Sequence, residues 1–268
     1  MFFLKKNKKN DAVLKISKEE SFLAIDIGTE YVKSVVYTAK DGEIHVLGYN
    51  RMKQKETTMY AAFIINLTEA IDTIDKSIGE AYAMAKEISL DSISAPKNAI
   101  IGIAGELVQG VTILVNIDRQ EGDSVINKKE IDDIVRKVKQ HTFENTKEDI
   151  AKEMNLKSSQ IDEVGTYINS VYIDGVRVIN PLGYKGQEIV YRVFSTFAPK
   201  IYLNTISQLA SNLHINTSKI IVEPYALSLG LKNARNQDSS SIIIDIGGGT
   251  TDVALIKNGD IIGTKMFA

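Results

Sequence analysis

The sequence predicts an α/β protein that is organised around two similar strand–turn–strand units. One unit spans residues 22–36 and the other spans residues 241–256, and each has an apolar strand, an Asp-x-Gly turn followed by a hydroxyl residue, and a second apolar strand. Between the two units, capping sequences precede apolar residues at helical spacing. Two copies of one uncommon turn indicate two half-sites that face each other.

Length and composition exclude several classes of protein. A chain of 268 residues can bury a large core in one or two domains, and 44% apolar with 25% charged residues is typical of globular proteins. A formal charge of -2 gives no reason to expect a nucleic-acid partner, because binding to a phosphate backbone normally requires a strong basic excess. The absence of cysteine excludes disulfides and thiolate metal sites and fits a reducing compartment.

Residues 1–20 are expected to be a disordered polar tail. Their few apolar residues precede the lysines, which is the reverse of a signal peptide. No run in the chain approaches the roughly 18 consecutive apolar residues that indicate a membrane-spanning helix.

Residues 21–97 are expected to form the first group of elements. Strands at residues 22–27, 32–38 and 43–49 form a meander, whose second turn, Asp41-Gly42, is a strong hairpin signal. Asn66 with a glutamate three residues later is typical of a helix start, and apolar spacing extends that helix to residue 87.

Residues 98–198 are predicted to be an inserted subdomain. It contains strands at residues 98–104, 107–117, 165–173 and 188–197 and a helix that opens at Asn127. A second helical piece is expected between residues 141 and 160, where dense mixed charge indicates a solvated face.

Residues 199–235 are expected to rejoin residues 21–97 in one subdomain, and residues 236–268 to begin a second, truncated one. A helix at residues 201–213 and a short strand at residues 219–222 come first. Glu223-Pro224 then starts another helix, because proline is favoured at the first helical position.

The second turn, residues 247–249, has the features of a phosphate site. Consecutive glycines let backbone N–H groups approach an anion with no Cβ in the way, and the hydroxyls of Thr250 and Thr251 can add hydrogen bonds. Asp245 and Asp252 would repel phosphate directly, so a hard cation held through its waters, such as Mg²⁺, is the natural mediator. An ordinary hairpin is the alternative, and the matching first turn favours the phosphate site.

These motifs resemble, in order and spacing, those of the superfamily of actin, sugar kinases and heat-shock chaperone ATPases. The matching residues are Asp26-Ile27-Gly28-Thr29, residues 245–252 and, between them, Glu223-Pro224-Tyr225-Ala226. Within the superfamily the chain most resembles the bacterial cell-division FtsA family, through residues 98–105, 172–175 and 180–186. From about residue 21 onward, the resemblance implies an actin-like (ribonuclease H-like) ATPase domain that carries the small inserted subdomain of that family.

The resemblance also implies roles for individual residues. Asp26 and Asp245 would hold Mg²⁺ through water, and with Glu223 they would form the catalytic group. Glu223 would orient the attacking water, or it is only an acid that complements a helix dipole, and both interpretations stay open. The residues implied to wrap the phosphates of ATP are Gly28, Thr29, Gly247, Gly248, Gly249, Thr250 and Thr251, with Lys33 nearby.

Two features depart from the family pattern. Glu30 stands where a small residue is usual, which puts a carboxylate close to the phosphates. The chain stops at Ala268, before a second adenosine motif, the rest of the second nucleotide-binding domain and the C-terminal amphipathic helix by which FtsA attaches to the membrane. We therefore expect a fragment or a truncated reading frame.

The function implied is that of an ATP-binding scaffold of cell division. Such a protein would self-associate and link the tubulin-like FtsZ to the inner face of the cell membrane at the division site, with membrane contact only through the missing helix and with at most weak ATP hydrolysis. One alternative is a pilus-assembly homologue like PilM, against which the inserted subdomain and its loop at residues 180–186 favour division. A small-molecule kinase would need a further acid as base. A third alternative is an interaction module that does not depend on nucleotide, in which the glycine turns no longer bind phosphate.

Overall fold

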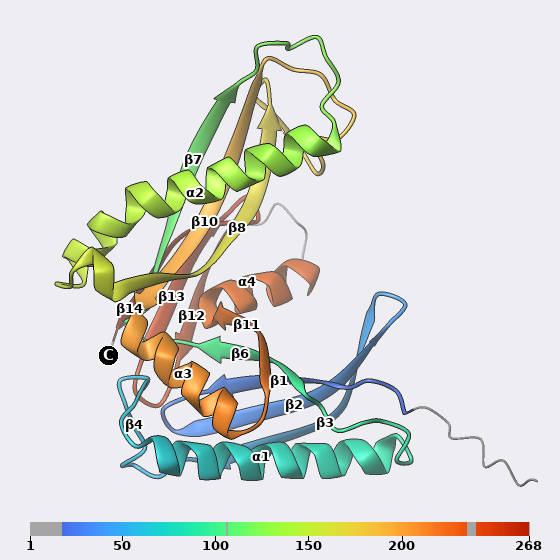
Figure 1. The fold of residues 1–268 in the computed structure, drawn as a ribbon, viewed down its shortest axis with the longest axis vertical. Coiled ribbons are helices and arrows are strands. Elements are labelled where there is room, and N and C mark those ends of the chain that lie inside the picture. Colours follow the sequence, from blue (N-terminus) through green and yellow to red (C-terminus); the bar gives the residue numbers. More distant parts are fainter. Residues whose placement is uncertain (1–17, 106, 235–239, 268) are drawn as a thin grey trace, which may run out of the picture.

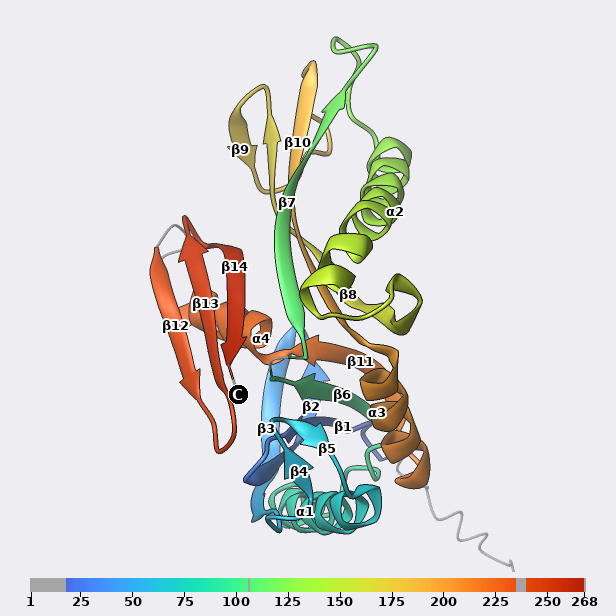
Figure 2. The ribbon, with the colours of Figure 1, turned by 90° about the vertical axis from the view of Figure 1, so that its left-hand side faces the viewer.

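The computed structural model describes residues 18–267 except residues 106 and 235–239. Figure 1 shows a five-stranded sheet with helix α1 at one end of the molecule and a second sheet with helix α2 at the other. A three-stranded sheet lies beside them, as the turned view in Figure 2 shows. The mixed α/β class predicted from the sequence is confirmed.

The five-stranded sheet has the order β11-β6-β1-β2-β3. The predicted meander is confirmed as antiparallel pairing of β1 with β2 and of β2 with β3, while β6 and β11 add in parallel beyond β1. The strands are β1 (Phe22–Ile27), β2 (Tyr31–Lys40), β3 (Glu43–Lys53), β6 (Asn98–Ile103) and β11 (Asn216–Val222).

Helices α1 (Leu67–Ile88) and α3 (Lys200–Asn212) pack on this sheet. As predicted, Asn66 caps α1, because its side-chain oxygen accepts a hydrogen bond from the N–H of Glu69 at 3.2 Å. Two short strands that the sequence analysis did not anticipate, β4 (Met59–Tyr60) and β5 (Phe63–Ile64), form a hairpin before α1.

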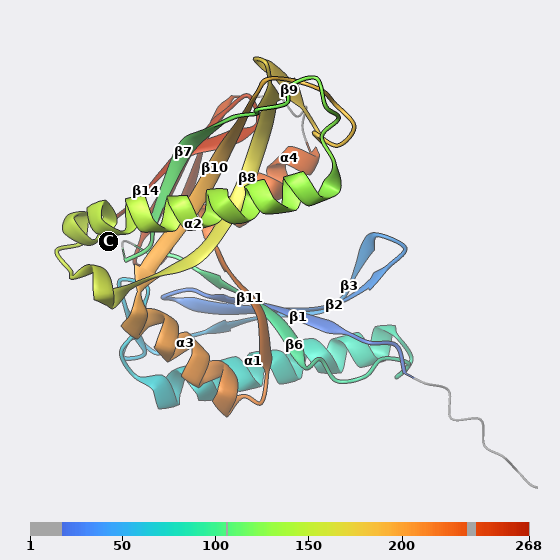
Figure 3. The same ribbon diagram turned by 45° about the horizontal axis from the view of Figure 1, so that its top comes forward.

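The inserted sheet has the order β7-β10-β8-β9, with α2 (Lys128–Glu153) across one face (Figure 3). Its strands are β7 (Gln109–Asp118), β8 (Ile161–Ile173), β9 (Val176–Val178) and β10 (Glu188–Pro199), and a short 3₁₀ turn (Ser158–Gln160) precedes β8. Asn127 caps α2 as predicted. The expectation of a separate second helical piece was wrong, because no glycine or proline interrupts residues 128–153 and the helix continues.

The boundary of the inserted subdomain also differs from the expectation. We assigned residues 98–104 to it, but β6 pairs with β1 and β11 inside the first sheet, so the inserted strands begin with β7. The apolar pattern of β6 predicts a buried strand, but it does not predict which strands β6 pairs with.

The N-terminal tail expected at residues 1–20 lies outside the described residues up to residue 17. The three residues that follow are ordered, which corrects the expectation for them. The N–H of Glu19 donates to the carbonyl of Ser92 at 2.9 Å, and the N–H of Ser94 donates to the carbonyl of Glu19 at 2.9 Å. These two hydrogen bonds satisfy the backbone N–H and carbonyl groups of Glu19 and hold this part of the chain in place.

The third sheet consists of β12 (Ser241–Ile246), β13 (Thr251–Lys257) and β14 (Asp260–Phe267), and α4 (Glu223–Ala234), which starts at Glu223 as predicted, packs against it. β14 lies against β7 of the inserted sheet. Residues 235–239, which connect α4 to β12, lie outside the described residues.

A buried carboxylate joins the third sheet to the inserted sheet. The side chain of Asp260 is 0% exposed and accepts hydrogen bonds from Arg177 and Arg192, each at 3.1 Å, and from the hydroxyl of Ser170 at 2.6 Å. The carbonyl of Ile261 next to it accepts from two further side chains of the inserted sheet. A buried charge held by several donors fixes the relative position of the two sheets.

We therefore predict that Asp260→Asn destabilises the protein by about 2–4 kcal/mol, because the change removes the charge that two arginines and a hydroxyl share. Urea unfolding followed by circular dichroism measures this loss. Asp133→Asn is the matched control, since Asp133 forms an exposed ion pair within α2 and should contribute less than about 1 kcal/mol. Equal effects of the two substitutions would contradict the prediction.

Candidate functional site

The residue that follows β3, Gln54, holds the first Asp-x-Gly turn in place. The N–H of Gly28 donates to the carbonyl of Tyr31 at 3.1 Å, which closes the turn. The side-chain amide of Gln54 donates to the carbonyl of Gly28 at 2.7 Å, and the N–H of Gln54 donates to the carbonyl of Glu30 at 2.8 Å. Gln54 is only 4% exposed, so its contacts with the turn are shielded from water.

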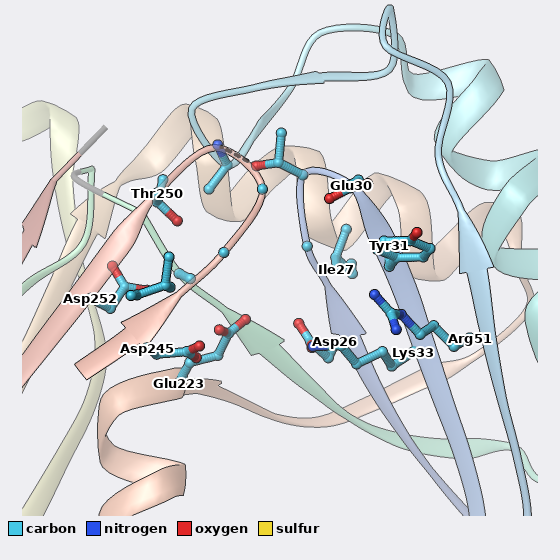
Figure 4. A pocket seen from close by; sticks show the side chains of 17 residues that line it. Asp26, Ile27, Glu30, Tyr31, Lys33, Arg51, Glu223, Asp245, Thr250 and Asp252 are labelled. Carbon is cyan, nitrogen blue, oxygen red and sulfur yellow. Dashed lines mark hydrogen bonds and ion pairs between the residues drawn. The ribbon is translucent and has the colours of Figure 1, made fainter. Parts of the chain in front are cut away.

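The second turn joins β12 to β13, and the N–H of Gly247 closes it by donating to the carbonyl of Thr250 at 2.8 Å. A Cβ at position 248 would lie 2.5 Å from the Cβ of Glu30, and one at position 249 would lie 2.9 Å from the hydroxyl of Thr29. The two turns therefore touch, as Figure 4 shows, and only glycine leaves room for the other turn at these positions.

Both turns line one pocket of about 210 Å³. Figure 4 shows Asp26 reaching into it from β1, Asp245 from β12 and Glu223 from the start of α4. The pocket also contains the following residues that the sequence analysis named: Gly28, Thr29, Lys33, Gly247, Gly248 and Thr250. Gly249 and Thr251 are not among its lining residues, because Gly249 is packed on Thr29 and Thr251 pairs within the third sheet.

Acidic side chains concentrate negative charge in this pocket. Burial, followed by the nearby charge of Asp26, raises the pKa of Glu223 to about 9, and the charges of Asp245 and Asp252 act in the same direction. Burial and the charge of Asp245 raise the pKa of Asp252 to about 6, although a backbone N–H of Gly105 opposes the shift. The pocket therefore favours a cation.

Lys33 supplies one positive charge. Its Nζ lies 2.6 Å from Oδ2 of Asp26, and this hydrogen bond is the main reason why the pKa of Lys33 is raised. Burial lowers the pKa, and the charges of Glu223 and Asp245 raise it further.

The donor set fits a cation that keeps its own water. One carboxylate oxygen each of Asp26, Glu223 and Asp252 is buried without a hydrogen-bond partner among the protein groups, which is costly unless another ligand satisfies it. Within the described part of the chain, no group of three or more histidine, aspartate or glutamate side chains is placed to hold a metal directly. Mg²⁺ commonly keeps several waters and takes one or two carboxylates, so these residues fit it.

Three residues of the site were missed by the sequence analysis. Gln54 holds the first turn, while Tyr31 and Arg51 line the pocket. Their positions depend on the pairing of β2 with β3, and no local motif marks them. Asp252 was noted as an acid of the second turn but was not assigned to the site, and it lines the pocket beside Asp245.

Comparisons with known proteins identify the class of fold to which this protein belongs. A family model described as MreB/Mbl protein matches residues 193–267. A chain of the PilM–PilN type IV pilus biogenesis complex has a similar structure, with a TM-score of 0.58 at 12% identity over 92% of this chain and 61% of that one. The fold is that of the actin-like ATPases.

In sequence the chain is FtsA-like. It is 26% identical to the cell division protein FtsA of Streptococcus pneumoniae over 92% of this chain and 49% of that protein. It is 21% identical to FtsA of Neisseria meningitidis over 94% of this chain and 56% of that protein. The chain thus spans about half the length of the curated relatives it matches.

The acid cluster predicts a pH dependence of stability in metal-free protein. Because the folded-state pKa of Glu223 is about 9 and the ordinary value is 4.5, the folded state retains a proton that the unfolded state releases between these values. Stability should therefore fall as pH rises from 5 to 8, and Glu223→Gln should reduce that fall by about 1–3 kcal/mol. Urea unfolding in EDTA at the two pH values measures it.

Glu80→Gln on the exposed face of α1 controls for the substitution itself. A wild-type protein that gains stability from pH 5 to pH 8, or a Glu223→Gln variant with the same pH slope as wild type, would contradict the assignment of a strained, buried acid.

Proposed function

We propose that the chain binds ATP together with Mg²⁺, as the nucleotide-binding part of an FtsA-like division protein. The observation that carries the proposal is that two Asp-x-Gly turns from different sheets line one pocket together. Glycine turns present N–H groups to an anion, while carboxylates require a cation beside them, and a magnesium-bound polyphosphate provides both charges.

The proposed roles follow from where each group lies. The N–H groups of the two turns other than those of Gly28 and Gly247, which close the turns, and the hydroxyls of Thr29 and Thr250 bind phosphate oxygens. Asp26 and Asp245 hold the cation through water, and the cation neutralises charge on the phosphates. Glu223 is buried between these acids, in a position to accept a hydrogen bond from a water at the pocket floor.

The pocket is too small to enclose a whole nucleotide. Pockets that surround a small molecule are roughly 300–1,000 Å³, and this one is about 210 Å³. It fits the polyphosphate end of a nucleotide better than the whole of it. Binding by this chain should therefore depend mainly on the phosphates, and we propose at most slow hydrolysis.

The cellular role is proposed from the FtsA likeness. We propose that the protein self-associates and links FtsZ to the inner face of the cell membrane at the division site. Among the described residues, none of the helices has the length and apolar character of a membrane span. From the FtsA likeness, we propose that membrane contact is made through a separate amphipathic segment. A role in pilus assembly is less well supported, because the likeness to PilM is one of fold.

Isothermal titration with ATP and Mg²⁺ tests the proposed site. We expect Asp26→Asn and Asp245→Asn to weaken Mg²⁺-dependent ATP binding by about tenfold or more, because each removes a carboxylate that holds the cation. Asp41→Asn is the matched control, since Asp41 lies in the exposed β2–β3 turn, where asparagine tolerates its positive φ of 53°. We expect Asp41→Asn to bind like wild type.

Other results of these experiments would contradict the proposal. A wild-type chain that does not bind ATP with Mg²⁺, or Asp26→Asn and Asp245→Asn variants that bind as tightly as wild type, overturns the assignment. Phosphorylation of a sugar from a mixed pool by the wild-type chain would instead favour a small-molecule kinase.

A further inference from the structure

The pocket contains more acidic than basic side chains, and among the described residues only one of its two basic side chains is paired with an acid. The described residues that line it include the carboxylates Asp26, Glu30, Glu223, Asp245 and Asp252 but only two cationic side chains, Lys33 and Arg51. Lys33 is paired with Asp26 at 2.6 Å. Arg51 forms no ion pair with any of the described residues, so its charge is available to a ligand.

Strand register places Arg51 in a row with two groups of the site. Asp26 of β1 is directly opposite Lys33 of β2, and Lys33 is directly opposite Arg51 of β3. Directly opposed residues share one face of a sheet, and two like charges in that position repel each other. Asp26 compensates the charge of Lys33, whereas no acidic side chain of the described sheet lies opposite Arg51.

An aromatic ring holds the guanidinium at the pocket wall. Cζ of Arg51 lies 3.6 Å from the centroid of the Tyr31 ring, a close cation–π contact. Figure 4 shows the guanidinium between that ring and Lys33. Tyr31 is itself fixed, because its carbonyl closes the first turn. Stacking restricts the side chain before any ligand arrives, which lowers the entropy cost of a later contact.

We propose that Arg51 is a further ligand-binding residue of this site, whose guanidinium binds phosphate oxygens of the bound polyphosphate. Guanidinium groups bind phosphate through two parallel hydrogen bonds, and stacking on an aromatic ring leaves the N–H edge free for this. The inference rests on the proposed function and extends it by assigning a cationic phosphate contact to β3, outside the two glycine turns.

The test compares Arg51→Gln with wild type for two probes, ATP with Mg²⁺ and inorganic tripolyphosphate with Mg²⁺. We expect Kd to rise about tenfold for both, because the lost contact is to phosphate. The dependence of Kd on salt concentration should also become shallower, since one screened charge has been removed. Arg51→Lys should lie between wild type and Arg51→Gln, because it keeps the charge but loses the paired hydrogen bonds.

Tyr31→Leu should weaken both probes less than Arg51→Gln does, since it removes the stacking platform and keeps the charge. Arg136→Gln on α2 is the matched control: it has the same change of side chain and charge, at an exposed position that is paired with Asp133 of the same helix. We expect it to bind both probes like wild type. Circular dichroism melts show whether each variant is folded.

The outcomes distinguish a failure of the proposed ATP binding from a failure of the proposed phosphate contact of Arg51. If wild type binds neither probe, the proposed function fails and this inference fails with it. If wild type binds both and a folded Arg51→Gln variant binds them equally well with an unchanged salt dependence, this inference alone is overturned. A loss of ATP binding without a loss of tripolyphosphate binding also overturns it, because the contact would then not be to phosphate.

Discussion

The site depends on the contact between the two glycine turns. Gly248 packs against Glu30 and Gly249 packs against Thr29 so closely that a Cβ at either glycine would clash. This approach brings the end of β1 and the end of β12, which belong to different sheets, to one pocket. A wider separation would leave the acids as ordinary exposed side chains of two unrelated hairpins.

The arrangement is electrostatically unfavourable without a ligand. Glu223 and Asp252 are buried beside Asp26 and Asp245, and both have raised pKa values. Unpaired buried oxygens on three of these acids add a further cost. Strain of this kind is typical of functional sites, where a bound cation or proton relieves it. The rest of the fold must therefore hold the two sheets together against the repulsion.

The inserted sheet contributes to that task from two directions. Tyr225, two residues after Glu223, stacks on Tyr167 of β8 with 3.9 Å between ring centroids. The ring of Phe194 of β10 lies 5.6 Å from the ring of Tyr225. On the other side, Asp260 anchors the start of β14 to the arginines of β9 and β10. The helix that carries Glu223 and the sheet that carries Asp245 are thus both attached to the inserted subdomain.

The sequence by itself determined the local elements and the chemistry of the turns. Alternating apolar residues, the caps at Asn66 and Asn127, and the glycines of the second turn are local signals, because each acts on neighbours within a few residues. Only the tertiary structure decided that β6 joins the first sheet and that Gln54 and Arg51 belong to the site. These depend on pairing between segments far apart in the chain, and a one-residue change of strand register would turn Arg51 to the opposite face.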